Sequence, residues 1–140
     1  MLTKIHSRRG GFTLVEIMIV VAIIALLAAI AVPSFLRARK RSQATSCLET
    51  ARLLDGAKDQ YAIENGKSST VTPNWSDLTV YVKTGSALYI ALSANVTPLD
   101  ALQNSFVMNN IDKPPQISSA TEAAVSDVLP NPSAFWGSYY

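Results

Sequence analysis

The stretch that decides the fold covers residues 11–32 and reads GFTLVE followed by IMIVVAIIALLAAIAV. Residues 12–32 number 21, and all of them except Thr13 and Glu16 are apolar. A helix rises about 1.5 Å per residue, so this segment would span roughly 30 Å, the thickness of a bilayer's hydrocarbon core. Because the segment is apolar on every side, we expect lipid or other protein to cover it.

The composition of the whole chain agrees with one hidden apolar segment. The protein has 140 residues, of which 49% are hydrophobic and only 16% charged, against about 25% charged in average soluble domains. A net charge of +2 is too small to argue for nucleic acid, and we expect no nucleic-acid partner. One Cys and one His exclude an internal disulfide framework and a Cys/His zinc site.

Cations lie on both sides of the apolar segment. Three precede it and four follow it: Lys4, Arg8 and Arg9, then Arg37, Arg39, Lys40 and Arg41. The positive-inside rule therefore does not decide which side of a membrane the C-terminal part occupies. The four that follow have two readings, an anchor on anionic lipid headgroups or a solvated helix face.

Two ordinary readings of the segment are open. A cleavable secretory signal would use the small-x-small site at residues 29–31, and the mature chain would start near Val32. A single-span anchor would keep Met1. The secretory reading has two features against it, because Glu16 would put a costly carboxylate in the apolar region and four cations would directly follow the cut.

The hexapeptide at residues 11–16, after a basic leader and before a long apolar helix, resembles the class III signal of type IV pilins and type II secretion pseudopilins. The resemblance covers residues 8–45 closely and the rest of the chain only in layout. It implies that a membrane-embedded prepilin peptidase cuts between Gly11 and Phe12 and that the new N-terminal Phe12 is N-methylated. A glycine before the cut permits the close backbone approach that a protease needs.

The resemblance also implies assembly roles for two residues. Glu16 would set the register of an incoming subunit by pairing with the amine of a neighbour's Phe12, since a carboxylate among packed helices needs a cation. Pro33 would kink or locally melt the helix rather than stop it, because proline removes one helical hydrogen bond and helical residues resume at once. The simpler reading of Glu16 is an acid that snorkels at a helix end.

What the resemblance implies overall is a structural subunit and not an enzyme. Its partners would be the prepilin peptidase and methyltransferase, the lipid bilayer before assembly, an inner-membrane assembly platform, and identical or related pilins or pseudopilins in a helical filament. The subunit would span the bacterial inner membrane once, leader in the cytoplasm and head outside, before it enters a periplasmic pseudopilus or a cell-surface pilus. The alternative is a monomeric membrane-anchored or secreted binding protein that uses its head as a ligand module.

No pattern in the sequence indicates a catalytic site, a cofactor site or a metal site. The single His6 lies in the leader, and neither a nucleotide-binding loop nor a nucleophile elbow occurs. Asp100, Asp112 and Asp127 are too scattered to build the oxygen cage that calcium needs.

The helical pattern continues to Asn65, and Gly66 supplies a C-terminal stop. Apolar residues at spacings of mostly three or four predict a packed face made of Ala44, Cys47, Leu48, Ala51, Leu54 and Tyr61. The wetter positions are Arg52, Asp55, Lys58, Asp59 and Glu64. We therefore divide the chain into a cleaved leader (1–11), an apolar helix (12–36), its amphipathic continuation (37–65) and a small head (66–140).

The head predicts a pilin-like α+β fold, in which a small antiparallel sheet of two to four strands packs across the helix. Residues 86–93 and 106–111 read as strands, and residues 75–82 as a short helix or a strand. A capping box that begins at Ser119 predicts a helix to about Leu129.

The tail is rich in aromatic residues, namely Phe135, Trp136, Tyr139 and Tyr140. A head of 75 residues has too little core by itself and needs the apolar face of the long helix. We expect the tail aromatics to fill the edge of this core, with subunit contacts or a solvent-exposed binding patch as the other readings.

Overall fold

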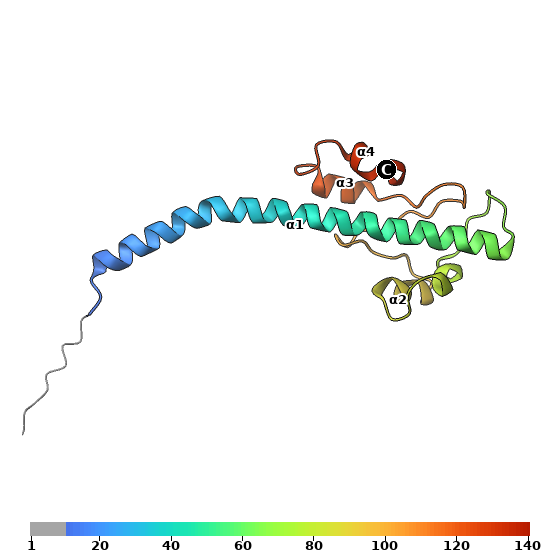
Figure 1. The fold of residues 1–140 in the computed structure, drawn as a ribbon, viewed down its shortest axis with the longest axis horizontal. Helices are drawn as coiled ribbons and strands as arrows, with labels where there is room; N and C mark the ends of the chain where they lie inside the picture. The colour runs from blue at the N-terminus through green and yellow to red at the C-terminus, as the bar shows by residue number, and fades with distance from the viewer. Residues whose placement is uncertain (1–10) are drawn as a thin grey trace, which may run out of the picture. The chain divides into compact units, whose positions relative to one another are not determined.

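The computed structural model describes residues 11–140, so the expected leader lies outside the described residues except for Gly11. The chain divides into two compact units, Met1–Leu36 and Arg37–Tyr140. Helices account for the regular structure, and their order along the chain is visible in Figure 1. They are α1 (Leu14–Asn65), the 3-10 helix η1 (Trp75–Tyr81), α2 (Ala87–Ser93), α3 (Ser119–Val125), α4 (Pro132–Trp136) and the 3-10 helix η2 (Gly137–Tyr139).

Helix α1 begins and ends close to where the sequence predicts. It starts one residue after Thr13, continues through Pro33 and ends at Asn65. Gly66 follows with a φ of +56°, a left-handed conformation that suits glycine, and the Lys67 N–H donates to the carbonyl oxygen of Ala62 at 3.0 Å. The expectation that Pro33 does not stop the helix is confirmed.

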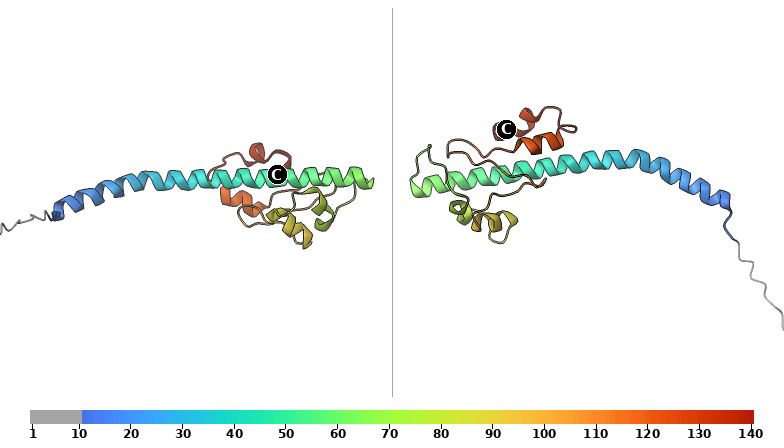
Figure 2. Two further views of the ribbon diagram at one scale, coloured as in Figure 1. Left: turned by 60° about the horizontal axis from the view of Figure 1, so that its bottom comes forward. Right: turned by 180° about the vertical axis from the view of Figure 1, so that it is seen from behind.

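The core of the second unit is built on one stripe of α1. The predicted packed face is confirmed. Its buried members are Ala44, Cys47, Leu48, Ala51 and Leu54, and Tyr61 is partly buried against them. Segments from the head flank this part of α1, with α2 on one side and α3 and α4 on the other in Figure 1 and in the right view of Figure 2. Ala57 of α1 is also buried, and the head contributes the other buried apolar side chains, which are Leu78, Leu92, Phe106, Ile117, Val125, Val128 and Trp136.

The strand predicted over residues 86–93 is wrong, because these residues form helix α2. Ser86 caps this helix by accepting a hydrogen bond at its hydroxyl from the Tyr89 N–H at 3.0 Å. Leu88 is half-buried and Leu92 buried, so apolar residues four apart supply the packed side. Short apolar runs fit helix and strand equally well, and here the serine cap decides for helix.

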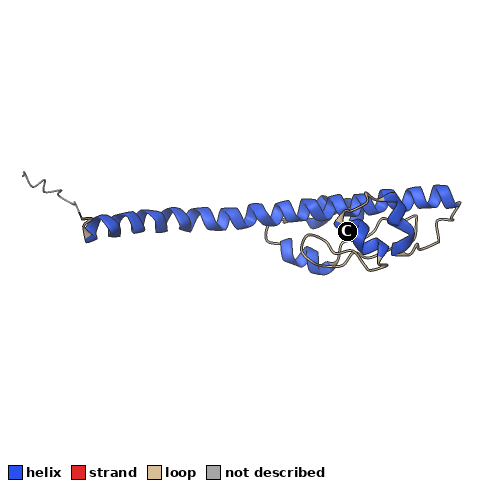
Figure 3. Cartoon of the chain, turned by 90° about the horizontal axis from the view of Figure 1, so that it is seen from below, coloured by secondary structure: helices blue, strands red, loops and turns tan. Residues whose placement is uncertain are grey.

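The predicted antiparallel sheet is not found in the described part of the chain, so the head is helical and irregular rather than α+β. Residues 106–111 form no strand, and the ladder consists of two isolated antiparallel bridges, Leu99 with Ser105 and Val107 with Gln116. Figure 3 draws the connections between helices as loops. Prolines at 98, 114 and 115 remove three backbone donors from this region, which limits the length of any ladder.

The remaining predictions for the head hold in part. Residues 75–81 form a 3-10 helix, one of the two forms predicted. Helix α3 is capped by Ser118 instead of Ser119 and ends at Val125, short of Leu129. Asn131 and Pro132 start the short helix α4, where Pro132 fits the first turn because no intrahelical donor is needed there.

The aromatic tail joins the core, as expected. Trp136 is 1% exposed and stacks edge-on against Phe135, with ring centroids 4.7 Å apart. Tyr139 is half-buried, and its hydroxyl donates to the Asp55 carboxylate on α1 at 3.2 Å. Tyr140 remains about half exposed.

Candidate functional site

The predicted cleavage point lies in accessible chain. Gly11 and Phe12 precede α1 in irregular backbone, and the Phe12 side chain is 85% exposed. A Cβ placed on Gly11 would meet no atom within 4 Å. The structure therefore puts no steric demand of its own on a glycine here.

Thr13 and Glu16 close a capping box at the start of α1. The Thr13 N–H and hydroxyl both donate to Oε2 of Glu16, at 2.8 and 2.9 Å, and the Glu16 N–H donates to the Thr13 hydroxyl at 3.2 Å. The sequence Thr-Leu-Val-Glu fits the capping-box pattern, and the structure shows that Glu16 takes part in the cap. Since Oε1 has no partner among the described residues, the carboxylate can still receive another donor.

The apolar part of α1 presents its side chains to the outside on every face. Every residue from Leu14 to Leu36 is exposed, although nearly all are apolar. Among the described residues, α1 is the one helix long and apolar enough to cross a membrane. Burying apolar surface gains roughly 25 cal/mol per Å², so a surface of this kind favours lipid or the helices of other copies over water.

Pro33 is the one interruption in the hydrogen bonding of this segment that the sequence predicts. It has no N–H, so the carbonyl oxygen of Ala29 receives no helical hydrogen bond from it. The small side chains of Ala28, Ala29 and Ala31 precede Pro33 and permit close helix approach.

Asp100 of the head and Cys47 of α1 are both buried in the core of the second unit. Asp100 is buried and accepts from the N–H groups of Leu102 and Asn104, at 2.8 and 3.0 Å, and from the Thr121 hydroxyl. Burial, and then the nearby Asp100 carboxylate, raises the pKa of the Cys47 thiol to about 11, so the thiol stays protonated and unreactive near neutral pH.

Lys58 contradicts the sequence prediction that it is a wet position. Its side chain is fully buried, and Nζ donates to the carbonyl oxygens of Asn110, at 2.9 Å, and Lys113. Burial lowers the pKa of this ammonium, while the carboxylates of Asp55, Asp59 and Asp112 oppose the shift. Lys58 thus fastens the loop around residue 110 onto α1, which alternation and periodicity could not reveal.

The three acids considered for calcium do not meet. Asp100 is committed to Thr121, and Asp127 pairs with Lys40 at 2.9 Å. Within residues 11–140, no group of three or more His, Cys, Asp or Glu side chains is placed to hold a metal ion. The expectation of no metal site rests on the sequence and stays a prediction.

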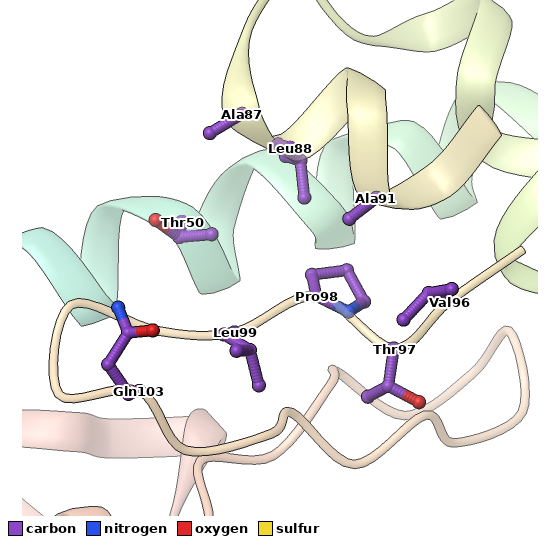
Figure 4. A pocket seen from close by; sticks show the side chains of 9 residues that line it. All are labelled: Thr50, Ala87, Leu88, Ala91, Val96, Thr97, Pro98, Leu99 and Gln103. Atoms are coloured by element: carbon purple, nitrogen blue, oxygen red, sulfur yellow. The ribbon is translucent and has the colours of Figure 1, made fainter. Parts of the chain in front are cut away.

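A cavity of about 400 Å³ opens between α1 and α2, and Figure 4 shows the side chains around it. Its lining is mostly apolar, with Thr50, Thr97 and Gln103 as the polar members. No titratable side chain lines it. It therefore lacks the groups that acid–base or nucleophilic chemistry requires.

Comparison with known proteins finds a family-model match near the start of this chain. Residues 6–32 match the family model of the prokaryotic N-terminal methylation motif. The resemblance expected from the sequence is thereby confirmed for this segment, which includes Gly11, Phe12 and Glu16. The matched segment is the one that resembles type IV pilins and type II secretion pseudopilins in sequence.

The relatives that are similar to this chain include type IV pilins and a type II secretion core protein. The chain is 39% identical over 67 residues to the type IV major pilin protein PilA of Myxococcus xanthus, which is 48% of this chain and 30% of that protein. It is 53% identical over 57 residues to the type IV wide pilus major component PilA4 of Thermus thermophilus, 39% of this chain and 42% of the relative. A type II secretion system core protein G of Klebsiella pneumoniae is 33% identical over 64 residues, 46% of each chain.

The similarity has a clear extent. The chain spans less than half the length of each of these relatives. No solved structure matches the chain. None of the three relatives bears the name of an enzyme.

Proposed function

We propose that the chain is a structural subunit of a type IV pilus or of a type II secretion pseudopilus. The observation that carries this proposal is the methylation motif at residues 6–32, together with a helix whose apolar side chains between Leu14 and Leu36 are not covered by any described residue. Pilins and a secretion core protein supply the similar sequences. Apolar surface on every face of one helix suits first a bilayer and then a bundle of identical helices.

Processing would begin at the exposed Gly11–Phe12 bond. In this proposal the prepilin peptidase removes residues 1–11, frees the amine of Phe12 and N-methylates it. The subunit would then span the inner membrane once with the head outside, before it enters a periplasmic pseudopilus or surface pilus through an assembly platform. Loss of the leader removes Lys4, Arg8 and Arg9, so the assembling end keeps a single amine cation.

Glu16 would take up that cation. One oxygen of its carboxylate accepts two hydrogen bonds from Thr13, and the other oxygen has no partner in the described region. A carboxylate brought among apolar helices costs several kcal/mol unless a cation compensates it. Pairing with the methylated amine of a neighbouring Phe12 would meet this cost only at the correct register. Pro33 would let the helix kink or melt during packing, since its carbonyl partner at Ala29 is already released.

The mass and N-terminal sequence of the mature protein test the proposal. The expected mature chain begins at N-methyl-Phe12, and the variant Gly11→Leu keeps its leader. A Cβ at Gly11 meets nothing in the structure, so loss of cleavage in that variant would reflect the peptidase and not misfolding. A mature chain that starts at Met1 or near Val32 would refute the proposal.

A further inference from the structure

Four cations follow the apolar segment, and the structure separates one of them from the other three. Lys40 donates two hydrogen bonds of 2.9 Å to the Asp127 carboxylate, which lies in the turn after α3. Arg37, Arg39 and Arg41 are exposed, and the structure gives them no ion-pair partner among residues 11–140. These three arginines, here called the arginine collar, are therefore available to an outside anion.

The three arginines of the collar lie on two opposite sides of α1. Successive residues of an α-helix are about 100° apart, so Arg37 and Arg41 lie about 40° from each other and Arg39 about 160° from both. A folded protein that docks along one side of the helix can reach Arg37 and Arg41 but not Arg39. A layer of charge that surrounds the helix reaches all three.

The collar also has the height of a lipid headgroup layer. From Arg37 to Arg41 there are four residue steps, or about 6 Å of helix rise. A bilayer is 40–45 Å thick with a hydrocarbon core of about 30 Å, which leaves about 5–8 Å for each headgroup layer. Phe35 and Leu36 are exposed and come directly before Arg37, so the change from apolar to basic surface takes place at one residue.

We propose that the arginine collar binds the phosphates of anionic phospholipids on the side of the membrane where the head lies. Guanidinium groups bind phosphate oxygens through paired N–H donors, which suits them to this partner. Lys40 does not take part because Asp127 occupies it. The proposal needs only a membrane-inserted α1 and not filament assembly, so it stands or falls separately from the function proposed above.

Native mass spectrometry of the full chain in detergent, mixed with equal amounts of phosphatidylglycerol and phosphatidylcholine, tests the collar. One basic side chain near an anionic surface contributes about fivefold (about 1 kcal/mol), so three predict roughly a 100-fold preference for phosphatidylglycerol. The triple variant Arg37→Gln, Arg39→Gln, Arg41→Gln should lose most of this preference. The control Lys67→Gln, Lys83→Gln, Lys113→Gln makes the same change in net charge on exposed head positions and should keep it.

Two results would overturn the proposal. One is an equal preference in the wild type and both triple variants, or an equal loss in both variants, because the collar would then have no special role. The other is a collar variant that keeps the preference for phosphatidylglycerol but loses its cross-links to a second copy, which would make the collar a subunit interface. Unchanged fluorescence of Trp75 and Trp136 verifies that each variant is folded.

Discussion

The two parts of helix α1, residues 14–36 and residues 44–57, differ in how their apolar side chains are covered. Residues 14–36 expose apolar side chains on every face, whereas residues 44–57 bury one stripe under the head and leave the rest to solvent. Side chains of this same chain cover the buried stripe, among them Leu78, Leu92, Phe106 and Trp136. Residues 14–36 have no such cover from residues 11–140. The C-terminal part of the helix therefore supplies a face of the head's core. The N-terminal part leaves apolar surface that only lipid or other copies could bury.

The largest expected effect comes from the one carboxylate of the first half. Glu16→Ala should leave membrane insertion and cleavage intact but abolish or severely reduce filaments, because the packed helices lose their pairing group. Shearing and electron microscopy of surface or periplasmic material measure this. Glu49→Ala, which removes an exposed acid from the second half, should assemble normally.

A second variant separates the charge of Glu16 from its capping role. Glu16→Gln keeps a side chain that can complete the box with Thr13 but removes the charge. We expect Glu16→Gln to fail as Glu16→Ala does. Normal filaments from Glu16→Gln would contradict a charge-pairing role and leave helix capping as the explanation.

Two adjacent leucines test the second half. Leu54 is fully buried and Leu53 is 63% exposed. Leu54→Ala should destabilise the head by about 3 kcal/mol, whereas Leu53→Ala should stay within about 0.5 kcal/mol of the wild type. Urea unfolding of the full chain in detergent, followed by the fluorescence of Trp75 and Trp136, gives both values. Equal losses would mean that the packed stripe is misassigned.

Cys47 reports the same burial chemically. Because the pKa of its thiol is raised to about 11, roughly one molecule in a thousand carries a thiolate at pH 8. We expect no iodoacetamide adduct on the folded chain and complete labelling after denaturation, both measured by mass. Rapid labelling of the folded chain would contradict the tight packing of this part of α1 against the head.

The smallest effect belongs to the ion pair between Lys40 and Asp127. The hydrogen bond from Lys40 lowers the pKa of the Asp127 carboxyl, so the pair stabilises the fold above the ordinary value of 3.8 and loses that contribution as the pH falls through the lowered value. Asp127→Asn should therefore lower the melting temperature slightly at pH 7. The difference from wild type should vanish at low pH and in about 1 M salt. A difference that persists in high salt would indicate a packing role.

Sequence reasoning succeeded where a pattern is long and failed where it is short. The limits of α1 and its buried stripe follow from more than fifty residues of continuous spacing and a glycine stop. Residues 86–93 offered too few residues to separate helix from strand, and the Ser86 cap decided the outcome. The predicted sheet was wrong for another reason. Prolines and hydrogen bonds from nearby side chains remove or occupy backbone groups of residues 98–116 that a sheet would need.

Residues of the candidate site that are neighbours in sequence could be predicted together, whereas contacts between residues far apart in sequence could not. Gly11, Phe12 and Glu16 lie in one hexapeptide, so the sequence could identify them together. Lys40 meets Asp127 across 87 positions and Lys58 meets Asn110 across 52, and no spacing rule connects such partners. Their roles came from the structure.

The central claim is that copies of this chain cover the exposed apolar half of α1. A photo-crosslinking residue at Ile23 tests it most directly in cells that make pili or secrete proteins. We predict cross-links between mature chains that are lost in Glu16→Ala, while the same probe at the buried Leu92 gives none. Cross-links to lipid alone, with no product that joins two chains, would contradict the account.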